Sequence, residues 1–529
     1  MSQPIPSVST LDKVYLPTPS DATVARHQEL HAAFVNRFGT EPDFVARSPG
    51  RVNIIGEHID YCGFSVLPMA VDRDVLIAVT ATPNTDPSQP STITLTNVNG
   101  EKYKEESFIH KPNDPNIIEI DASVHAWSNY FKCGYKGIHE DLKLTTPAPH
   151  LNVMISGNVP AGAGLSSSSA FVCATAVAVG RSVNAPLIKQ SLTETAIRSE
   201  RYSGVQTGGM DQSISIMASP SSALLIHFHP TLSAVPVLIP PSTRPYKFVV
   251  ANSLVTADKH VTAAKNYNLR VVETRVAASI LGAWVSGFHE GKGEFPGLQT
   301  LRGVIDLYLE KQKIELGSAA ELGTSGAAYI ETIKKLEAMT EVVFDEKSYS
   351  CDDVVVTLQK HFGSTQFQSW ADVEKVFCKG ISGVYLDDGL QLKKRVRHVF
   401  SEARRVIEFT EVCALNKPVY NGGDVLTELG NLMNASQASC AKDLNCSCPE
   451  LDELTSLCLE SGAVGSRLTG AGWGGCTVSL VPEELVDSFI KKVTDGYYAK
   501  HQSDLTNIGD WIFATTPGVG AVVLEGLKL

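Results

Sequence analysis

Residues Gly162-Ala163-Gly164-Leu165-Ser166-Ser167-Ser168-Ser169-Ala170 form a glycine- and serine-rich stretch that runs straight into an apolar segment ending near Val179. The pattern predicts a loop followed by a buried helix. A helix N-terminus offers unpaired N–H groups and the positive end of the helix dipole, and glycines let the backbone approach a ligand closely. Serine hydroxyls can bind phosphate or ligate magnesium. The stretch is therefore a candidate phosphate-binding loop, although it also suits a plain turn with a serine N-cap.

Two common nucleotide-binding patterns are missing from the chain. It contains no G-x-x-x-x-G-K-[ST] sequence, so the loop is not of the Walker type. It also lacks the H-R-D and D-F-G sequences of protein kinases. If the loop binds a nucleotide, it does so as part of a different kind of site.

Length and charge describe a large globular protein. At 529 residues the chain is long enough for roughly two to four domains. The formal net charge of −12 argues against nucleic acid or a membrane surface as partner, because either would need a basic face. A basic pocket for an anionic substrate would then be a local feature, which suits a nucleotide carried with its metal.

The sequence shows no secretory signal or membrane span. Met1 to Asp21 is polar, and the most apolar run, Ala170 to Val179, is about half a membrane span. The 11 cysteines are an odd number without paired spacing, and no second half of a zinc site accompanies Cys440, Cys446 and Cys448. We expect reduced thiols and a cytoplasmic location.

Helical and strand patterns alternate along the chain, which predicts an α+β protein with at least two layers per domain. Turn-rich and charged stretches separate them, and the segment from about 285 to 400 is the most charged and helical. Helices are expected over residues 23–38, 187–202, 267–281, 328–339, 392–406, 426–438 and 451–461, and strands over residues 44–46, 66–79, 151–155, 224–228, 248–251 and 476–481.

Two further glycine-containing segments are notable, one for its polar side chains and the other for its closely spaced glycines. Residues 47–61 (RSPGRVNIIGEHIDY) bring Arg, Glu, His and Asp into a short span that offers the alternating donors and acceptors a sugar needs. Residues 468–476 (LTGAGWGGC) place four glycines in six positions before a strand, which allows backbone to approach another backbone or a ligand. Each segment alone would also fit a surface turn or a tight structural turn.

In this order the three segments resemble the motifs of the GHMP small-molecule kinases, and within them the eukaryotic galactokinases. Pro49 to His58 looks like the galactokinase signature, Pro160 to Ala170 like the second motif and Gly470 to Gly475 like the third. The stretches GGMDQ at 208–212 and CSCPE at 446–450 are typical of the same branch. The resemblance covers about residues 25 to 525.

The resemblance implies the two-domain GHMP fold, with a ribosomal-protein-S5-like N-terminal domain, a ferredoxin-like C-terminal α/β sandwich and the active site in the cleft between them. We expect a loose N-terminal tail over 1–22, an N-terminal domain over 23–235 and a C-terminal domain over 236–529. The segment from about 285 to 400 carries no family motif and is expected to be a helical elaboration of the C-terminal domain.

Site residues follow from the resemblance by position. It implies sugar contacts at Arg51, Glu57, His58, Asp60, Asp211 and Tyr267, and nucleotide contacts at Gly162, Gly164, Ser166, Ser167, Ser168 and Lys259. Glu200 stands where the family has its magnesium carboxylate, with Ser167 or Ser168 as a second ligand. The neighbour of Lys259, Asp258, departs from the asparagine usual there.

The implied reaction is transfer of a phosphoryl group from ATP, with Mg²⁺, to the anomeric hydroxyl of D-galactose, giving α-D-galactose 1-phosphate and ADP as the first committed step of galactose catabolism. Phosphoryl transfer needs positioning, charge neutralisation and a group that orients the attacking hydroxyl. By resemblance Asp211 accepts the hydroxyl proton, and Arg51 keeps Asp211 ionised and stabilises charge on the transferred group. The protein is expected to act as a monomer.

Two alternatives stay open at this level. N-acetylgalactosamine kinases share the same motifs, but Tyr267 is the tyrosine of fungal-type galactokinases where the acetylated-sugar kinases tend to Phe. Some fungal relatives are instead galactose- and ATP-dependent inducers that bind a transcriptional repressor, and inactive ones lack a Ser-Ala dipeptide in the loop. Here the loop is full length, with Ser169 where Ala is common, so catalysis is expected, with repressor binding as a second role left open.

Overall fold

Two long strands rich in branched residues form the centre of the larger sheet. Strand β2 (Phe44–Ile55) pairs antiparallel with β3 (Leu67–Thr82), and irregular register near Pro49 and Asn53 bends β2 at the segment that carries Arg51. The computed structural model describes residues 3–124, 126–143, 148–204, 208–240, 244–256, 264–288, 297–314, 326–381, 383–386, 388–414, 419–420 and 423–527.

The larger sheet has seven strands in the order β1-β15-β2-β3-β6-β4-β5. A second sheet has four strands in the order β12-β13-β9-β14, and β7-β8 and β10-β11 form two-stranded sheets. The remaining strands are β1 (Ser7–Val8), β4 (Ser91–Asn97), β5 (Glu106–His110), β6 (His150–Gly157), β7 (Ala223–His227), β8 (Ser233–Val237), β9 (Tyr246–Asn252), β10 (Val419–Tyr420), β11 (Gly423–Asp424), β12 (Gly465–Thr469), β13 (Cys476–Pro482), β14 (Ile512–Thr515) and β15 (Val522–Leu524).

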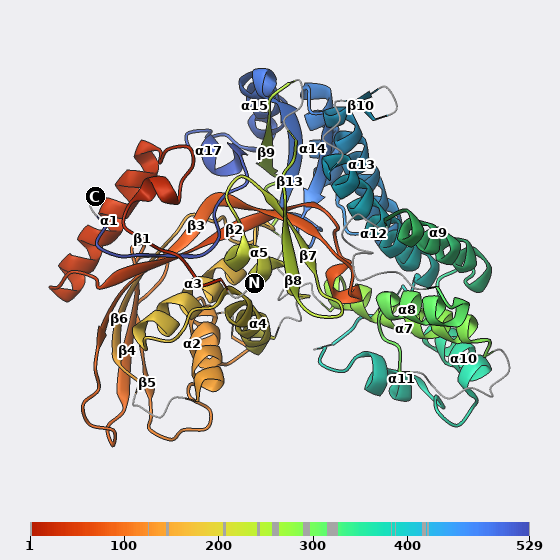
Figure 1. The fold of residues 1–529 in the computed structure, drawn as a ribbon, viewed down its shortest axis with the longest axis horizontal. Coiled ribbons are helices and arrows are strands. Elements are labelled where there is room, and N and C mark those ends of the chain that lie inside the picture. The colour runs from red at the N-terminus through yellow and green to blue at the C-terminus, as the bar shows by residue number, and fades with distance from the viewer. Residues whose placement is uncertain are drawn as a thin grey trace.

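Side chains of β3 alternate between the two faces of the larger sheet, and helices cover both. Leu76 and Ala78 pack under Leu30 and Phe34 of α1 (Asp21–Phe38), whereas Ile77 and its neighbours enter the main core on the other face. Figure 1 shows α2, α3 and α4 gathered on that second face. The α-helices between β5 and β7 are α2 (Ser128–Leu142), α3 (Ser167–Ser182), α4 (Lys189–Glu200) and α5 (Met210–Met217).

The smaller sheet lies in the upper middle of Figure 1 with α14 and α15 against one face, where Val249 and Ala251 pack with Leu454 and Phe489. The helical elaboration, from α7 to α12, extends to the right in Figure 1, away from the larger sheet. The helices of the elaboration are α7 (Tyr267–Ser286), α8 (Leu301–Gln312), α9 (Gly326–Val343), α10 (Cys351–Phe362), α11 (Trp370–Phe377) and α12 (Leu392–Ala414). The helices that follow it are α13 (Val425–Ser439), α14 (Pro449–Ser461), α15 (Val486–Val493), α16 (Ala499–His501) and α17 (Ile508–Trp511).

Mixed helices and mainly antiparallel strands confirm the predicted α+β class, and helices and strands occur at every segment where the sequence predicts them. Their edges move, most at β2 and α12, which run nine and eight residues past their predicted ends at 46 and 406. Within the described residues, no helix combines the length and apolarity needed to cross a membrane.

Both chain ends depart from the expected domain plan. Residues 3–15 were expected in a loose tail, yet β1 pairs parallel with β15, and Val14 and Tyr15 are buried. Strand β15 lies beyond residue 236, yet it pairs with β2 in the N-terminal sheet. Strands of only two or three residues are too short to show a hydrophobic periodicity, so their pairing is decided by the sheet edge they cover.

A buried ion cluster fastens these ends to the sheet. Asp74 of β3 accepts hydrogen bonds from Arg47 Nε and Tyr15 OH, both at 2.7 Å, and from Arg26 of α1. Arg47 also donates to the carbonyls of Val519 and Gly520 near the C-terminus. Burial alone would raise the pKa of Asp74, but the two arginines hold it well below its usual range.

We predict that Asp74→Asn lowers the free energy of unfolding by about 3–5 kcal/mol, because it leaves two arginines without a buried counter-charge. Denaturant unfolding at neutral pH measures the change. Glu105→Gln is the matched control, since Glu105 pairs with Arg37 at the surface and its loss should cost less than about 1 kcal/mol. Equal effects of the two substitutions would contradict a structural role for the cluster.

Candidate functional site

Six predicted side chains from three separate segments of the chain line one cleft of about 370 Å³. Arg51, Glu57, His58 and Asp60 come from β2 and the turn after it, Asp211 from α5, and Tyr267 from the start of α7. The backbone of Gly470 and Ala471 closes the cleft from the C-terminal half of the chain. The cleft therefore lies where the N-terminal and C-terminal halves meet.

Asp211 and Arg51 form a buried ion pair in this cleft. Asp211 lies in the first turn of α5, and its Oδ1 accepts from Arg51 Nε at 2.7 Å and lies 2.6 Å from Arg51 Nη2. The Asp211 side chain is 9% exposed and that of Arg51 3%. Arg51 Nη1 also donates to the carbonyl of Gly164, so one guanidinium joins the acidic cleft to the glycine-serine loop.

Two more carboxylates face the cleft, and both bind protons more readily than usual. Glu57 Oε2 lies 3.1 Å from Arg467 Nη2 and accepts from the Gly470 N–H at 3.2 Å, yet burial raises the pKa of Glu57 to about 7. Asp60 accepts backbone N–H groups of Tyr61 and Met210, and burial together with the charge of Asp211 raises its pKa to about 6. Such carboxylates can accept hydrogen bonds from hydroxyl groups of a bound ligand.

The segment around Asp60 depends on a close backbone approach at Gly208. A Cβ at position 208 would overlap Asp60 Oδ2 and lie 2.8 Å from the Tyr61 amide nitrogen. Gly209 follows with φ of +112° and leads into α5, which carries Asp211. The two glycines thus set the spacing between Asp60 and Asp211.

An aromatic wall encloses one side of the cleft. The His58 ring lies 5.2 Å from that of Tyr267 and 5.7 Å from that of Trp473, centroid to centroid, and Tyr61 contacts both His58 and Tyr267. His58 Nε2 donates to the Ala471 carbonyl at 2.9 Å, which leaves Nδ1 to accept from Tyr61 OH. The wall thus combines apolar ring faces with polar ring atoms that have hydrogen-bond partners.

The glycine-serine loop has the backbone shape of an anion cradle. Gly162, Gly164 and Ser166 all adopt positive φ, and helix α3 begins at Ser167 directly after them. Ser166 Oγ is buried and has no hydrogen-bond partner among the residues that the structure describes. Free N–H groups at a helix start and an unused hydroxyl suit a phosphate group.

The third glycine segment packs directly against this loop. A Cβ at Gly470 would lie 2.5 Å from the Gly164 carbonyl oxygen, and one at Gly475 would lie 3.0 Å from the Ala163 carbonyl carbon. Gly470 also donates its N–H to Glu57. The segment is both a tight structural contact and part of the cleft wall, so the two roles left open by the sequence occur together.

Glu200 lies at the end of α4 and is 3% exposed. Its carboxylate accepts from Gln212 Nε2, and the same Gln212 group lies 3.4 Å from Ser169 Oγ. No cluster of three or more His, Cys, Asp or Glu suited to a metal occurs in the described part of the chain. Lys259 lies outside the described residues; Thr256, three residues earlier, lies against Gly162.

A buried network of hydrogen bonds and ion pairs behind Glu57 was not predicted from the sequence. Arg467 is fully buried between Glu57 and the Asn53 carbonyl, and Glu402 of α12 accepts from the Gly56 N–H at 2.8 Å and the Glu57 N–H at 3.2 Å. Arg405 and Arg467 outweigh the effect of burial and lower the pKa of Glu402 to about 2. The signal available in the sequence was only an acidic residue on an apolar helix face.

Family models match three parts of the chain. The galactokinase galactose-binding signature matches residues 32–81, the GHMP kinases N terminal domain residues 129–219 and the GHMP kinases C terminal domain residues 424–499. The first two ranges contain every predicted site residue except Tyr267 and Lys259.

Curated relatives match over nearly the whole chain. A galactokinase of Dictyostelium discoideum is 38% identical, covering 98% of this chain and 97% of its own, and a galactokinase of Saccharomyces cerevisiae is 38% identical with 93% of each chain covered. Among solved structures, a Lactococcus lactis galactokinase complexed with galactose matches with a TM-score of 0.63 at 22% identity, covering 94% of this chain and 99% of its own. That structural match supports the fold.

The raised pKa of Glu57 gives a pH-dependent prediction. The folded protein holds a proton on Glu57 up to about pH 7, whereas the unfolded chain releases it near pH 4.5, so this residue lowers stability as pH rises through that window. Glu57→Gln stays neutral, and its stability relative to the unmodified chain should therefore rise between about pH 5 and pH 8. Chemical denaturation at several pH values measures the difference.

Glu105→Gln again serves as control, because contact with Arg37 lowers the pKa of Glu105 and places its titration below this range. Its stability difference from the unmodified chain should stay flat over the same pH range. A difference for Glu57→Gln that is equally flat would show that Glu57 is ionised throughout.

Proposed function

The chain belongs to the galactokinase family of GHMP kinases, and from this membership we propose that it transfers the γ-phosphoryl group of ATP to the anomeric hydroxyl of D-galactose. The products are α-D-galactose 1-phosphate and ADP. The observation that carries the proposal is the position of Arg51, which binds Asp211 in the cleft and the Gly164 carbonyl of the loop. Sugar hydroxyl and nucleotide phosphate would meet at this guanidinium.

The cleft offers a galactose molecule the contacts that fix its orientation. Glu57 and Asp60 are acceptors for sugar hydroxyls, and the aromatic wall of His58 and Tyr267 excludes water from one side. We assign the sugar contacts to Arg51, Glu57, His58, Asp60, Asp211 and Tyr267.

Asp211 is the proposed acceptor of the proton from the anomeric hydroxyl. Its Oδ1 is held by Arg51, and both groups are buried, so the pair stays fixed while the hydroxyl approaches. The positive charge of Arg51 also stabilises the negative charge that develops on the transferred phosphoryl group. This division of work needs no movement of either side chain.

The loop from Gly162 to Ser168 is the proposed binding site of the nucleotide phosphates, and Lys259 remains a proposed nucleotide contact. Positive φ values and the start of α3 support the assignment for the loop. Hard oxygen donors suit Mg²⁺, and Glu200 with Ser167 or Ser168 would hold it. When bound, Mg²⁺ neutralises phosphate charge during transfer.

We assign catalysis, rather than sensing alone, to this chain. The loop is full length, and Asp211 and Arg51 form their ion pair. All 11 cysteines are free and most are buried, which supports a location in the reducing cytoplasm. We propose a monomer; binding to a repressor protein would be a second role that leaves the catalytic pair in use.

A substrate panel tests the proposed activity. Release of ADP is expected with galactose and ATP, at much lower rates with N-acetylgalactosamine, and at background with glucose or mevalonate. A coupled assay of ADP release with each sugar at equal concentration measures the ratios of kcat/KM. Faster turnover of N-acetylgalactosamine than of galactose would overturn the choice of sugar while leaving the reaction type intact.

We predict that Asp211→Asn lowers kcat by about 10²- to 10⁴-fold, because the hydroxyl loses its proton acceptor while the shape of the cleft is kept. The KM for galactose should change by no more than a few-fold. Asp141→Asn is the matched control, since Asp141 contacts Thr195 and Arg198 away from the cleft. Full activity of the Asp211 variant would refute the mechanism even if galactose is the substrate.

A further inference from the structure

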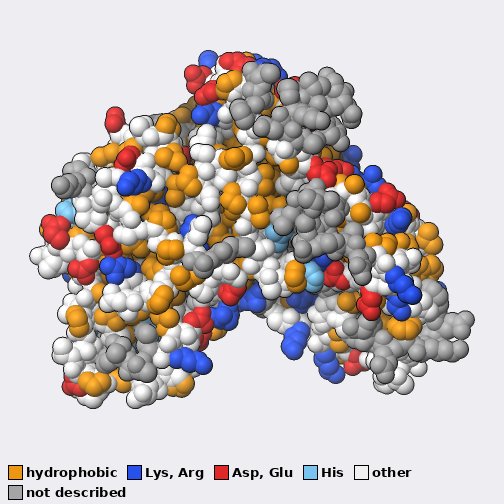
Figure 2. Space-filling model, viewed as in Figure 1, with side chains coloured by type: hydrophobic (Ala, Val, Ile, Leu, Met, Phe, Trp, Pro, Cys, Tyr) orange, Lys and Arg blue, Asp and Glu red, His pale blue; other side chains and the backbone are white. Residues whose placement is uncertain are grey.

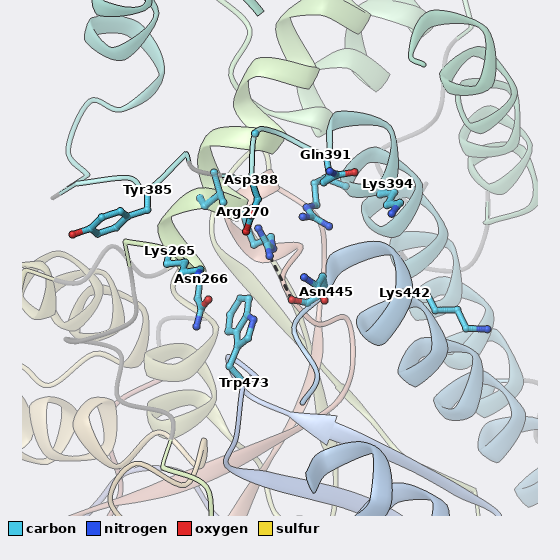
Figure 3. Close-up of a pocket in the computed structure, with 13 residues that line it drawn as sticks. Lys265, Asn266, Arg270, Tyr385, Asp388, Gln391, Lys394, Lys442, Asn445 and Trp473 are labelled. Atoms are coloured by element: carbon cyan, nitrogen blue, oxygen red, sulfur yellow. Dashed lines mark hydrogen bonds between the residues drawn. The ribbon is translucent and has the colours of Figure 1, made fainter. Parts of the chain in front are cut away.

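A second and larger pocket, of about 930 Å³, lies beside the sugar cleft and shares no residue with it. The first turns of α7 and α12 line it, together with the loop before α12, the turn after α13 and Trp473. Figure 3 shows Arg270, Asn445 and Trp473 facing one another across its inner end, whereas Lys442 and Tyr385 point away. Neither the proposed reaction nor the proposed nucleotide site uses these residues.

The pocket is strongly cationic on a protein whose formal net charge is −12. One carboxylate, Asp388, lines it, and a second, Glu273, lies behind it bound to two of the cations. A third carboxylate, Asp443, follows Lys442 in the chain, and its charge acts on Lys394 and Arg395. Five cations against three carboxylates leave a surplus of +2, or +1 without Lys442. The cations are Lys265, Arg270, Lys394, Arg395 and Lys442.

The two buried arginines form the fixed part of the site. Arg270 donates to Glu273 and to the Leu444 carbonyl, and Arg395 donates to Glu273 at 2.7 Å and to the Asp443 carbonyl at 2.6 Å. Glu273 is thus shared between two guanidiniums and balances only one of them. Arg395 Nη2 has no hydrogen-bond partner within the described ranges, and Arg395 is 3% exposed.

Two lysines, Lys265 and Lys394, add further positive charge to the pocket. On α12, Lys393 and Arg397 pair with Glu341 and Glu346. Lys394, which lines the pocket on the same helix, has no ion pair with any described residue, and the same holds for Lys265. Among the pocket-lining cations, Arg395 is therefore paired with Glu273, whereas Lys394 and Lys265 make no ion pair with a described residue.

Helix ends strengthen the attraction for an anion. The first turns of α7 and α12 both border the pocket, and each helix start carries the positive end of a dipole. The N-cap of α7, Asn266, makes no side-chain capping bond, and its amide is among the lining groups. In the view of Figure 2, Lys and Arg side chains gather along the rim of the hollow between the two lobes.

We propose that this pocket is a binding site for a small phosphate monoester, such as a sugar phosphate or a nucleoside monophosphate. A phosphate monoester carries −1.5 to −2 charges near neutral pH, which matches the local surplus, and its oxygens suit a guanidinium fork. The volume accommodates the organic part, and the amides of Asn266, Gln391 and Asn445 can bind hydroxyls. Inorganic phosphate would use only the inner end.

The pocket touches the sugar cleft through one side chain. Arg270 Cζ lies 5.5 Å from the Trp473 ring centroid, and the centroid of the His58 ring in the cleft lies 5.7 Å from that of Trp473. Tyr267 of the cleft precedes Arg270 by less than one helical turn. A ligand in the pocket would therefore contact the wall of the sugar site without entering it.

Isothermal titration tests the proposal with galactose 1-phosphate, glucose 6-phosphate, AMP and inorganic phosphate as separate probes. Galactose is present at saturation to keep the sugar cleft filled. The unmodified protein should bind at least one ester, and Lys265→Glu/Lys394→Glu should weaken that binding about tenfold or more, because two charge-assisted contacts become repulsive. Lys335→Glu, at an exposed lysine of α9 outside the pocket, is the matched control and should bind as the unmodified chain does.

The relative affinities for the four probes identify which kind of phosphate compound the pocket binds. Preference for galactose 1-phosphate would make the site a sensor of the proposed product, and preference for another ester would make it a sensor of a different metabolite. Equal affinity in the double variant and the control, binding of inorganic phosphate alone, or no binding of any ester at millimolar concentration would overturn the proposal. The double variant should keep galactose turnover, so unfolding and loss of the site are distinguishable.

Discussion

The guanidinium of Arg51 holds the two halves of the site in one arrangement. Its Nε binds Asp211 of α5, its Nη1 binds the Gly164 carbonyl, and its backbone N–H donates to the Leu165 carbonyl at 3.1 Å. A buried arginine needs a counter-charge and acceptors for its donors, because an unpaired buried charge is costly. Strand β2, helix α5 and the loop before α3 are therefore placed relative to one another by a single side chain.

A second constraint is the close packing of two backbone segments, which glycine makes possible. The loop around Gly164 and the turn around Gly470 approach backbone to backbone, with no room for a Cβ at Gly470. This contact joins residues more than 300 positions apart and brings the smaller sheet against the start of α3. The surroundings of the glycine-serine loop are consequently built from both halves of the chain, although its sequence motif is wholly local.

Buried charges behind the cleft connect the helical elaboration to the site. Glu402 of α12 accepts backbone N–H groups at Gly56 and Glu57, and His398 donates from Nε2 to the Glu57 carbonyl at 2.9 Å. Burial lowers the pKa of His398 to about 4, so it is neutral and its Nδ1 accepts from Ser439. The elaboration thus supports the segment that carries Glu57, and its other side forms the cationic pocket.

The sequence by itself determined the α+β class, most helices and strands, the family and the residues that line the cleft. These depend on local periodicity and on short motifs whose side chains lie near one another in the chain or in relatives. Only the tertiary structure decided that residues 3–15 and β15 complete the larger sheet, that Arg467 and Glu402 support Glu57, and that Lys265 and Lys394 border one pocket. Such contacts join segments far apart in the chain, and each depends on how whole helices and sheets pack, which no local pattern of residues records.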